Sequence, residues 1–140
     1  MKPNEKLSRM LHILVHIHLH QGAATSETIA QMLGTNAVVV RRMMANLRNL
    51  GYVQSHNGRG GGWQLQRDPA TLSVLDIYRA LGEPGLLAMG LSQDHPHCPV
   101  EQSVSFFLEP ALKAAEQNLL EQYAGITLFD IAEQATSKSR

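Results

Sequence analysis

The chain has 140 residues, 12 basic and 12 acidic side chains, one cysteine and a formal net charge of zero. This length suits one compact domain, or a small domain with an assembly element, and 44% hydrophobic residues are enough to form a core. A single cysteine excludes an intramolecular disulfide and any site built from several thiolates of one chain. No continuous apolar run reaches membrane-spanning length, so we expect a cytoplasmic protein without a membrane partner.

The zero net charge is the sum of two opposite halves. Residues 1–67 contain eight Lys and Arg against two acids, a balance of +6, whereas residues 68–140 contain four against ten, a balance of −6. A basic half joined to an acidic half indicates that the first half meets a polyanion and the second has another task.

The first half has the pattern of a winged helix. Residues 5–20 carry apolar side chains at three- and four-residue spacing, which predicts a helix. Thr25 or Ser26 can cap a second helix, and a third helix opens at Asn36. The residues that pack and turn a helix-turn-helix follow in order: Ile29, Ala30, Gly34, Val40 and Met43. Two short strands are expected at 52–55 and 63–66, joined by a glycine-rich loop.

The second half is expected to be helical. A capping-box pattern at 73–76 starts a short helix to residue 81, and residues 82–98 form a loop rich in Gly, Pro and His. A long helix spans 100–124, which Pro110 is expected to interrupt and kink. A second capping box at 127–130 starts a short last helix. The predicted fold class is mainly α with a small β-hairpin wing.

The candidate DNA contacts lie in the third helix and the wing. Arginine can grip guanine bidentately, asparagine can grip adenine, and valine can touch a thymine methyl group. In the wing, glycines let the backbone approach the duplex while an arginine enters a narrow minor groove. A solvated basic face is the alternative for the charged residues. The expected DNA-binding residues are Ser26, Asn36, Val38, Arg41, Arg42, Arg59 and Gly60.

Three stretches resemble one known family: SETIA at 26–30, LRNLGYV at 47–53 and, most specifically, GRGGGWQL at 58–65. They resemble the Rrf2 family of bacterial winged-helix transcriptional regulators, which includes IscR, NsrR and CymR. LSVLDI at 72–77 and TLFDI at 127–131 also fit, so the resemblance covers nearly the whole chain.

The resemblance implies a homodimer joined largely through the long C-terminal helix, with one winged helix on each half-site of a double-stranded DNA operator. On this basis the chain is divided into a winged helix-turn-helix DNA-binding domain at 1–81, a loop at 82–98, and the dimerisation helix with the short C-terminal helix at 99–140.

The sequence departs from the family's cluster-binding members. Those members hold an iron–sulfur cluster with three cysteines in the loop before the dimerisation helix, whereas this chain has only Cys98. It resembles the cluster-free, YwnA-like branch, and we expect no cofactor and no metal. Three hypotheses remain for Cys98: an inert packed thiol, a redox sensor near a helix N-terminus, or a metal ligand together with His95 and His97. The close spacing of these three residues disfavours the metal.

His12, His16 and His20 recur at four-residue spacing along the first helix. They could chelate a metal or report pH, but we favour a polar stripe on an otherwise apolar helix. Cys98 with a neighbouring histidine is the only candidate nucleophile–base pair in the sequence, and adjacency in sequence is a poor guide to catalytic geometry, so no enzymatic activity is expected.

The sequence therefore predicts a dimeric, sequence-specific DNA-binding regulator of transcription. A repressor is favoured, because a compact dimer can simply occlude a promoter, and a redox response through Cys98 is a further hypothesis. The alternative is a winged-helix module that binds protein, as an interaction or adaptor domain without a specific operator.

Overall fold

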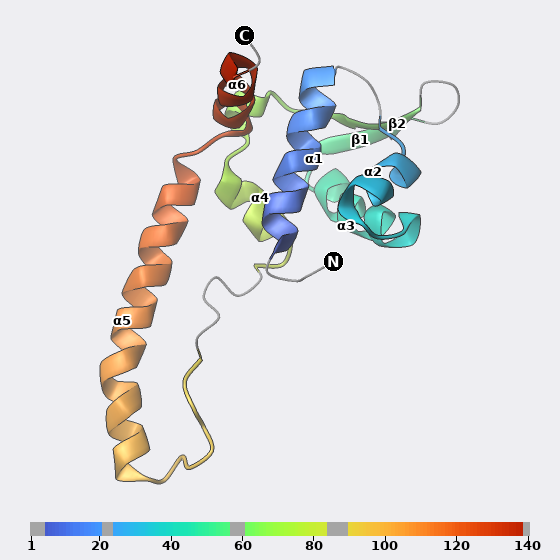
Figure 1. Cartoon of the computed structure of the whole chain (residues 1–140). Helices are drawn as coiled ribbons and strands as arrows, with labels where there is room; N and C mark the ends of the chain where they lie inside the picture. The colour runs from blue at the N-terminus through green and yellow to red at the C-terminus, as the bar shows by residue number, and fades with distance from the viewer. Residues whose placement is uncertain (1–4, 21–23, 57–60, 84–89, 139–140) are drawn as a thin grey trace.

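The computed structural model describes residues 5–20, 24–56, 61–83 and 90–138. The fold is mainly helical with one antiparallel hairpin, which confirms the predicted fold class (Figure 1). The elements follow in the order α1 (Lys6–His20), α2 (Ser26–Leu33), α3 (Ala37–Asn49), β1 (Val53–His56), β2 (Gly62–Leu65), the 3-10 turn η2 (Pro69–Thr71), α4 (Val74–Ala80), α5 (Pro99–Ala124) and α6 (Leu128–Lys138).

Helix α1 runs through the middle of the core. Its apolar residues recur at helical spacing and form one fully buried face, which includes Met10, Ile13 and Leu14. Helices α2, α4 and α6 and strand β2 all pack against α1. These neighbours together shield the apolar side chains of α1 from water, so α1 is the central element of the core.

The helix-turn-helix forms as the sequence predicts. Thr25 caps α2, because its side chain accepts a hydrogen bond from the backbone N–H of Thr28. Gly34 ends α2 in the left-handed conformation, with φ of 68°, where a side chain would add strain. Asn36 caps α3 in the same way as Thr25 caps α2, through a 3.1 Å bond from the backbone N–H of Val39 to its Oδ1.

The wing hairpin is bound to the rest of the domain. Strands β1 and β2 pair antiparallel, from Val53 opposite Leu65 to His56 opposite Gly62. The strands lie one residue away from the positions expected from the sequence, because the pairing extends toward the loop to His56 and Gly62. Trp63 also pairs with Ala24, just before α2, which joins the hairpin to the helix-turn-helix.

Both capping boxes predicted in the second half are present. At the start of α4, the backbone N–H of each of Ser73 and Asp76 donates a hydrogen bond to the side-chain oxygen of the other. Thr127 and Asp130 make the same two hydrogen bonds at the start of α6. A backbone hydrogen bond also joins the segments that lead into α4 and α6: the N–H of Leu128 donates to the carbonyl of Leu72 at 2.9 Å.

Helix α6 packs into the core of the N-terminal half. Leu128 and Ala132 are 1% and 3% exposed, and α6 lies against α1 and η2. The sequence-based division grouped this helix with the dimerisation helix at 99–140. In the tertiary structure α6 lies against the winged-helix body, where its apolar face covers the apolar face of α1.

Helix α5 projects away from this body as a long arm (Figure 1). It runs unbroken from Pro99 to Ala124, so the prediction that Pro110 interrupts the helix is wrong. The proline lies on an exposed helix, where water can bond to the carbonyl of Phe106 that has lost its intrahelical donor. Among the described residues, no helix is long and apolar enough to cross a membrane.

Candidate nucleic-acid interface

The exposed face of α3 carries the basic side chains of the helix-turn-helix. Val40, Met43, Met44 and Leu47 are buried against the core. The helical repeat then turns Val38, Arg41 and Arg42 to solvent, and the side chain of Val38 is 60% exposed. The structure thus brings three of the predicted DNA contacts onto one outward-facing surface.

Asn36 stands at the start of the same helix. Its Oδ1 accepts the capping bond from Val39, and the residue is exposed. A bidentate contact with adenine needs both the oxygen and the nitrogen of the amide. The capping bond uses one of the two lone pairs of Oδ1 and fixes the orientation of the amide, so an adenine contact of Asn36 has to be made with the amide in that orientation.

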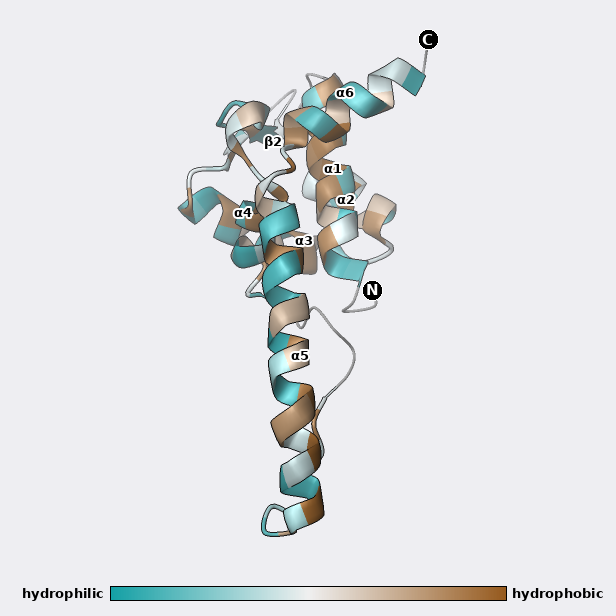
Figure 2. Cartoon of the chain, turned by 90° about the vertical axis from the view of Figure 1, so that its left-hand side faces the viewer, coloured by the Kyte–Doolittle hydropathy of each residue, from teal (hydrophilic) through white to brown (hydrophobic). Residues whose placement is uncertain are grey.

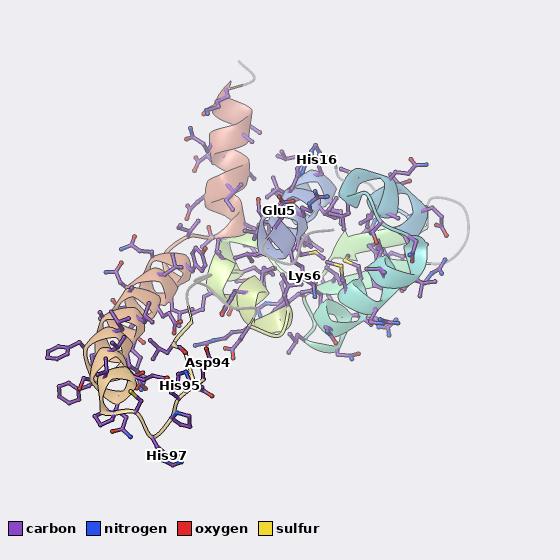
Figure 3. The ribbon with its side chains drawn as sticks, turned by 60° about the horizontal axis from the view of Figure 1, so that its bottom comes forward. Glu5, Lys6, His16, Asp94, His95 and His97 are labelled. Carbon is purple, nitrogen blue, oxygen red and sulfur yellow. The ribbon has the colours of Figure 1, made fainter. Side chains whose placement is uncertain are left out.

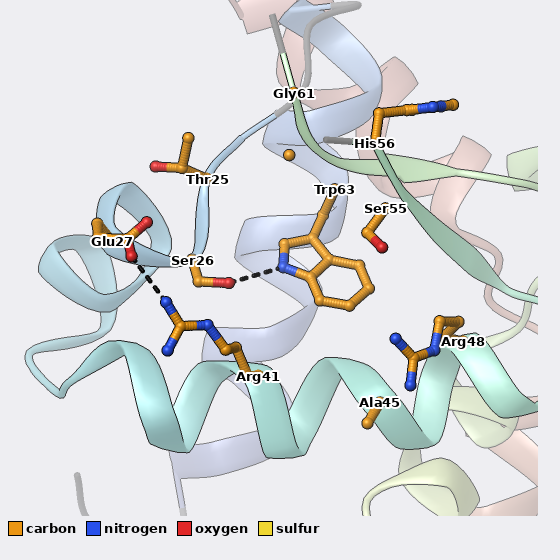
Figure 4. Close-up of a pocket in the computed structure, with 11 residues that line it drawn as sticks. Thr25, Ser26, Glu27, Arg41, Ala45, Arg48, Ser55, His56, Gly61 and Trp63 are labelled. Carbon is orange, nitrogen blue, oxygen red and sulfur yellow. Dashed lines mark hydrogen bonds and ion pairs between the residues drawn. The ribbon is translucent and has the colours of Figure 1, made fainter. Parts of the chain in front are cut away.

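A hollow of about 490 Å³ lies between the N-terminus of α2, the outer face of α3 and the hairpin (Figure 4). Arg41 and Arg48 border it from α3, His56 and Trp63 from the two strands, and Thr25 from the start of α2. The hollow joins the helix-turn-helix to the wing in one concave basic surface, which matches the two elements that a winged helix presents to DNA.

Arg41 is ion-paired within this surface. Its Nη2 lies 2.9 Å from the Oε1 of Glu27 on α2, and the two side chains are 57% and 66% exposed (Figure 4). An exposed pair contributes little to stability. Its consequence is local: Glu27 holds the guanidinium toward α2 and places a carboxylate at the surface that phosphates would approach.

Ser26 faces inward from the same region. Its hydroxyl accepts a 2.9 Å hydrogen bond from the indole Nε1–H of Trp63, and the two residues are 9% and 6% exposed. The structure therefore gives the side chain of Ser26 an internal partner, and a contact with DNA would have to use its remaining O–H from a residue that is only 9% exposed. Ser26 positions the hairpin against α2, a role that the sequence prediction of a DNA contact did not include.

Gly62 allows the hairpin to approach the segment before α2. Its φ of 138° is a conformation that residues with side chains rarely adopt. A Cβ atom at this position would lie 2.6 Å from the backbone carbon and oxygen of Ala24, well inside contact distance. The glycine before Trp63 is thus required by the bridge between Trp63 and Ala24.

Arg48 was not among the predicted DNA contacts. It is exposed on α3, borders the hollow, and follows Arg41 by seven residues, or two helical turns, which places both on one face. That spacing was the signal available in the sequence. In contrast, Arg9 is used within the fold, because it pairs with Glu5 at 3.0 Å and donates to the carbonyl of Leu33. Arg9 therefore does not contribute to the basic surface beside the hairpin.

Arg59 and Gly60 lie outside the described residues. The chain enters their loop at His56 and leaves it at Gly61, and both of these residues border the hollow.

Cys98 and its neighbouring histidines lie elsewhere. His95 and His97 are in the loop beside the N-terminal end of α5, away from α3 (Figure 3). Cys98 is partly exposed at the residue before Pro99, and the backbone N–H of His95 donates to Glu101 at 2.8 Å. Within the described residues, no group of three or more His, Cys, Asp or Glu side chains is placed to hold a metal ion.

Helix α4 joins the body to α5 through an aromatic contact. The rings of Tyr78 and Tyr123 lie 6.4 Å apart between centroids. Burial raises the pKa of the Tyr78 phenol, and the negative charges of Glu83 and Glu116 raise it further. The phenol is therefore held in its neutral form at the point where the arm leaves the body.

Three known proteins, one compared by sequence and two by structure, each match more than 90% of the chain. YwnA of Bacillus subtilis, whose name assigns it to the HTH-type transcriptional regulators, is 31% identical over 128 residues, which are 91% of this chain and 95% of that protein. The structure of IscR from T. potens has 26% identity and a TM-score of 0.65, covering 96% of this chain and 86% of that one. CymR of B. subtilis, described as the global cysteine regulator, shares the fold at 22% identity and a TM-score of 0.62, covering 96% and 95%.

A family model described as "Rrf2: Iron-dependent Transcriptional regulator" matches residues 4–134. The residues present do not fit a cluster held by three thiolates, because the chain has one cysteine and the described part of it contains no three-residue donor group. The match and the identity to YwnA extend over nearly the whole length, as the resemblance predicted. The chain belongs to the Rrf2 family, whose members are DNA-binding transcriptional regulators and not enzymes.

Proposed function

We propose that the protein is a homodimeric regulator that binds a roughly palindromic operator and represses transcription by occluding the promoter. The observation that carries the proposal is the concave basic surface between α3 and the hairpin, bordered by Arg41, Arg48 and His56. We assign Val38 and Arg42, on the exposed face of α3, to base edges and Arg48, which borders the hollow, to phosphates. Arg59 of the predicted wing is assigned to phosphates on the basis of the sequence alone. Arg41 reaches DNA only if it leaves or shares its pair with Glu27.

The exposed apolar side chains of α5 support the dimer. This helix has 26 residues and none is buried in the single chain. Its N-terminal half is rich in hydrophobic residues (Figure 2), and several of them are exposed. Exposed apolar area of this extent is typical of a protein interface. The α5 helix of a second copy has the same apolar face and would cover it. The exposed residues are Val100, Val104, Phe106, Phe107 and Leu108, which are 71%, 49%, 73%, 74% and 48% exposed.

The dimer is tested by sedimentation analysis of the wild type and of Phe107→Asp. A carboxylate in an apolar interface is costly, so the variant should shift from dimer to monomer. Lys113→Asp is the control on the same helix, since Lys113 is exposed and ion-paired to Glu109 on its own chain. A wild-type monomer at micromolar concentration would overturn this part of the proposal.

DNA binding is tested by selecting bound genomic fragments and measuring affinity by fluorescence anisotropy as salt increases. If a dimer neutralises about six phosphates, the slope of log K against log salt should be on the order of −5. Arg48→Ala should lower affinity for all sequences, whereas Arg42→Ala should also relax sequence preference. Arg79→Ala removes the same charge from α4, where it is paired with Glu83, and should change little.

Failure to recover an operator, or a flat salt response, would refute the DNA-binding proposal and favour the adaptor alternative. Repression itself is tested with a reporter gene behind the recovered operator. Deleting the regulator should raise expression, and a fall would identify an activator instead.

A redox response through Cys98 remains part of the proposal. The thiol is partly exposed and precedes the first turn of α5, next to the apolar face assigned to the dimer. Oxidation there would add a polar group beside that interface. Operator affinity should then differ between reduced and peroxide-treated protein and should not differ for Cys98→Ser. Equal affinities in both proteins would make Cys98 structural.

A further inference from the structure

Two histidines of α1 form a pair that the DNA-binding proposal does not use. His12 and His16 stand one helical turn apart, and their Nε2 atoms are 2.9 Å from each other. The ring centroids are 4.7 Å apart, with the ring planes inclined at 51°. His12 is exposed and His16 is half-buried, so an ion can reach the pair from solvent. In Figure 3, His16 lies on α1, well separated from the loop that carries His95 and His97.

The separation of the two Nε2 atoms suits two ligands of one metal ion. Imidazole nitrogens bind divalent transition metals at about 2.0–2.1 Å. Two nitrogens at that distance from one ion are about 2.9 Å apart at a 90° angle and about 3.4 Å apart at a tetrahedral angle. In the absence of an ion this 2.9 Å separation is a hydrogen bond between the two rings, so one Nε2 carries the shared proton. A metal ion would replace that proton, with both rings turned toward it, at the nitrogen separation that the right-angled arrangement of octahedral and tetragonal ions requires.

We propose that His12 and His16 bind one divalent ion of the late first-row transition metals, with Cu²⁺ and Ni²⁺ preferred to Zn²⁺. Two histidines at positions i and i+4 of a helix are a known chelating arrangement. Both rings must present the Nε2 lone pair and carry their proton on Nδ1. Water supplies the remaining ligands, because the described residues include no third side chain of a ligating type placed at such a site.

An ion at this position would link two consecutive turns of α1, the central helix, and so stabilise its helical conformation. His12 and His16 span one turn on the outer side of α1, while Met10, Ile13 and Leu14 on its other faces are buried in the core. A ligand that binds only the folded helix shifts the folding equilibrium toward the native state. Metal binding should therefore stabilise the whole winged-helix body, independently of whether DNA is bound.

The test is a calorimetric titration of the purified, tag-free full chain with CuCl₂, NiCl₂ or ZnCl₂ alone, at neutral pH. We expect one ion per chain, with affinity in the order Cu²⁺ over Ni²⁺ over Zn²⁺. At about 100 times Kd the midpoint of thermal unfolding should rise by roughly 5 °C or more. The variants His12→Gln and His16→Gln should each weaken binding at least tenfold and abolish the thermal shift.

The matched control is His18→Gln, which removes another histidine of α1 outside the pair and should leave binding unchanged. Equal weakening by all three variants, or wild-type affinity in His12→Gln, would overturn the proposal. Binding lost only in His97→Gln would also overturn it, by placing the ion in the loop before α5. Far-UV circular dichroism of each variant checks that its helix content matches that of the wild type.

Discussion

Replacing Ser26 by Ala tests the bond that holds the hairpin to α2. The substitution removes the acceptor of the Trp63 Nε1–H, and with Ser26 9% and Trp63 6% exposed, water has little access to take its place. An unsatisfied buried donor costs about 1–3 kcal/mol, and the lost oxygen leaves only a small space. We expect the free energy of unfolding to fall by about 1–2 kcal/mol and the midpoint of thermal unfolding to fall by roughly 3–8 °C.

The assay is urea unfolding followed by far-UV circular dichroism at one protein concentration, since dimerisation would make stability depend on concentration. A double-mutant cycle isolates the bond. Trp63→Phe keeps an aromatic ring but removes the N–H, so the pair Ser26→Ala and Trp63→Phe together should cost less than the sum of the single changes, by about 0.5–1.5 kcal/mol. Ser55→Ala, at an exposed serine opposite Trp63 in the hairpin, is the control.

Two results would refute the reasoning. An unchanged free energy of unfolding in Ser26→Ala would mean that the buried bond contributes nothing. A variant as stable as the wild type but with weaker operator binding would instead make Ser26 the DNA contact that the sequence predicts.

Three further predictions concern the surface, the hairpin and the arm. Glu27→Gln should tighten DNA binding about three- to tenfold at low salt, because it releases Arg41 and removes a carboxylate that repels phosphate; weaker binding would mean that Glu27 positions the arginine. Gly62→Ala should cost at least about 3 kcal/mol in urea unfolding, because its Cβ would overlap the backbone of Ala24; a loss below about 1 kcal/mol would contradict the required close approach. The pKa of Tyr78 is higher in the folded state than in the unfolded state, so the unfolded chain loses the phenol proton first as pH rises. The contribution of Tyr78 to the free energy of unfolding is therefore complete below its unfolded pKa of about 10 and is lost as pH rises above it. The wild type should therefore lose more unfolding free energy than Tyr78→Phe between pH 9 and 11, and equal losses would contradict this.

The sequence by itself determined the elements whose signals are local. Thr25 and Asn36 cap helices, Gly34 turns the chain, and both capping boxes occupy their predicted positions. Each of these bonds joins residues within one turn, so residue type and spacing are sufficient to predict them. The amphipathic face of α3 follows from the same periodicity and placed Val38, Arg41 and Arg42 correctly on the outside.

Only the tertiary structure decided how the site is held and where its charges point. Ser26 is 37 residues from Trp63, and Glu27 is 14 from Arg41. Helix α6 lies on α1 across more than 100 residues of chain. Local pattern does not determine which distant side chains meet, because that depends on how the apolar faces of α1, α2 and the hairpin pack. That packing made Ser26 a buried acceptor for Trp63 and bound Arg41 to a carboxylate at the basic surface.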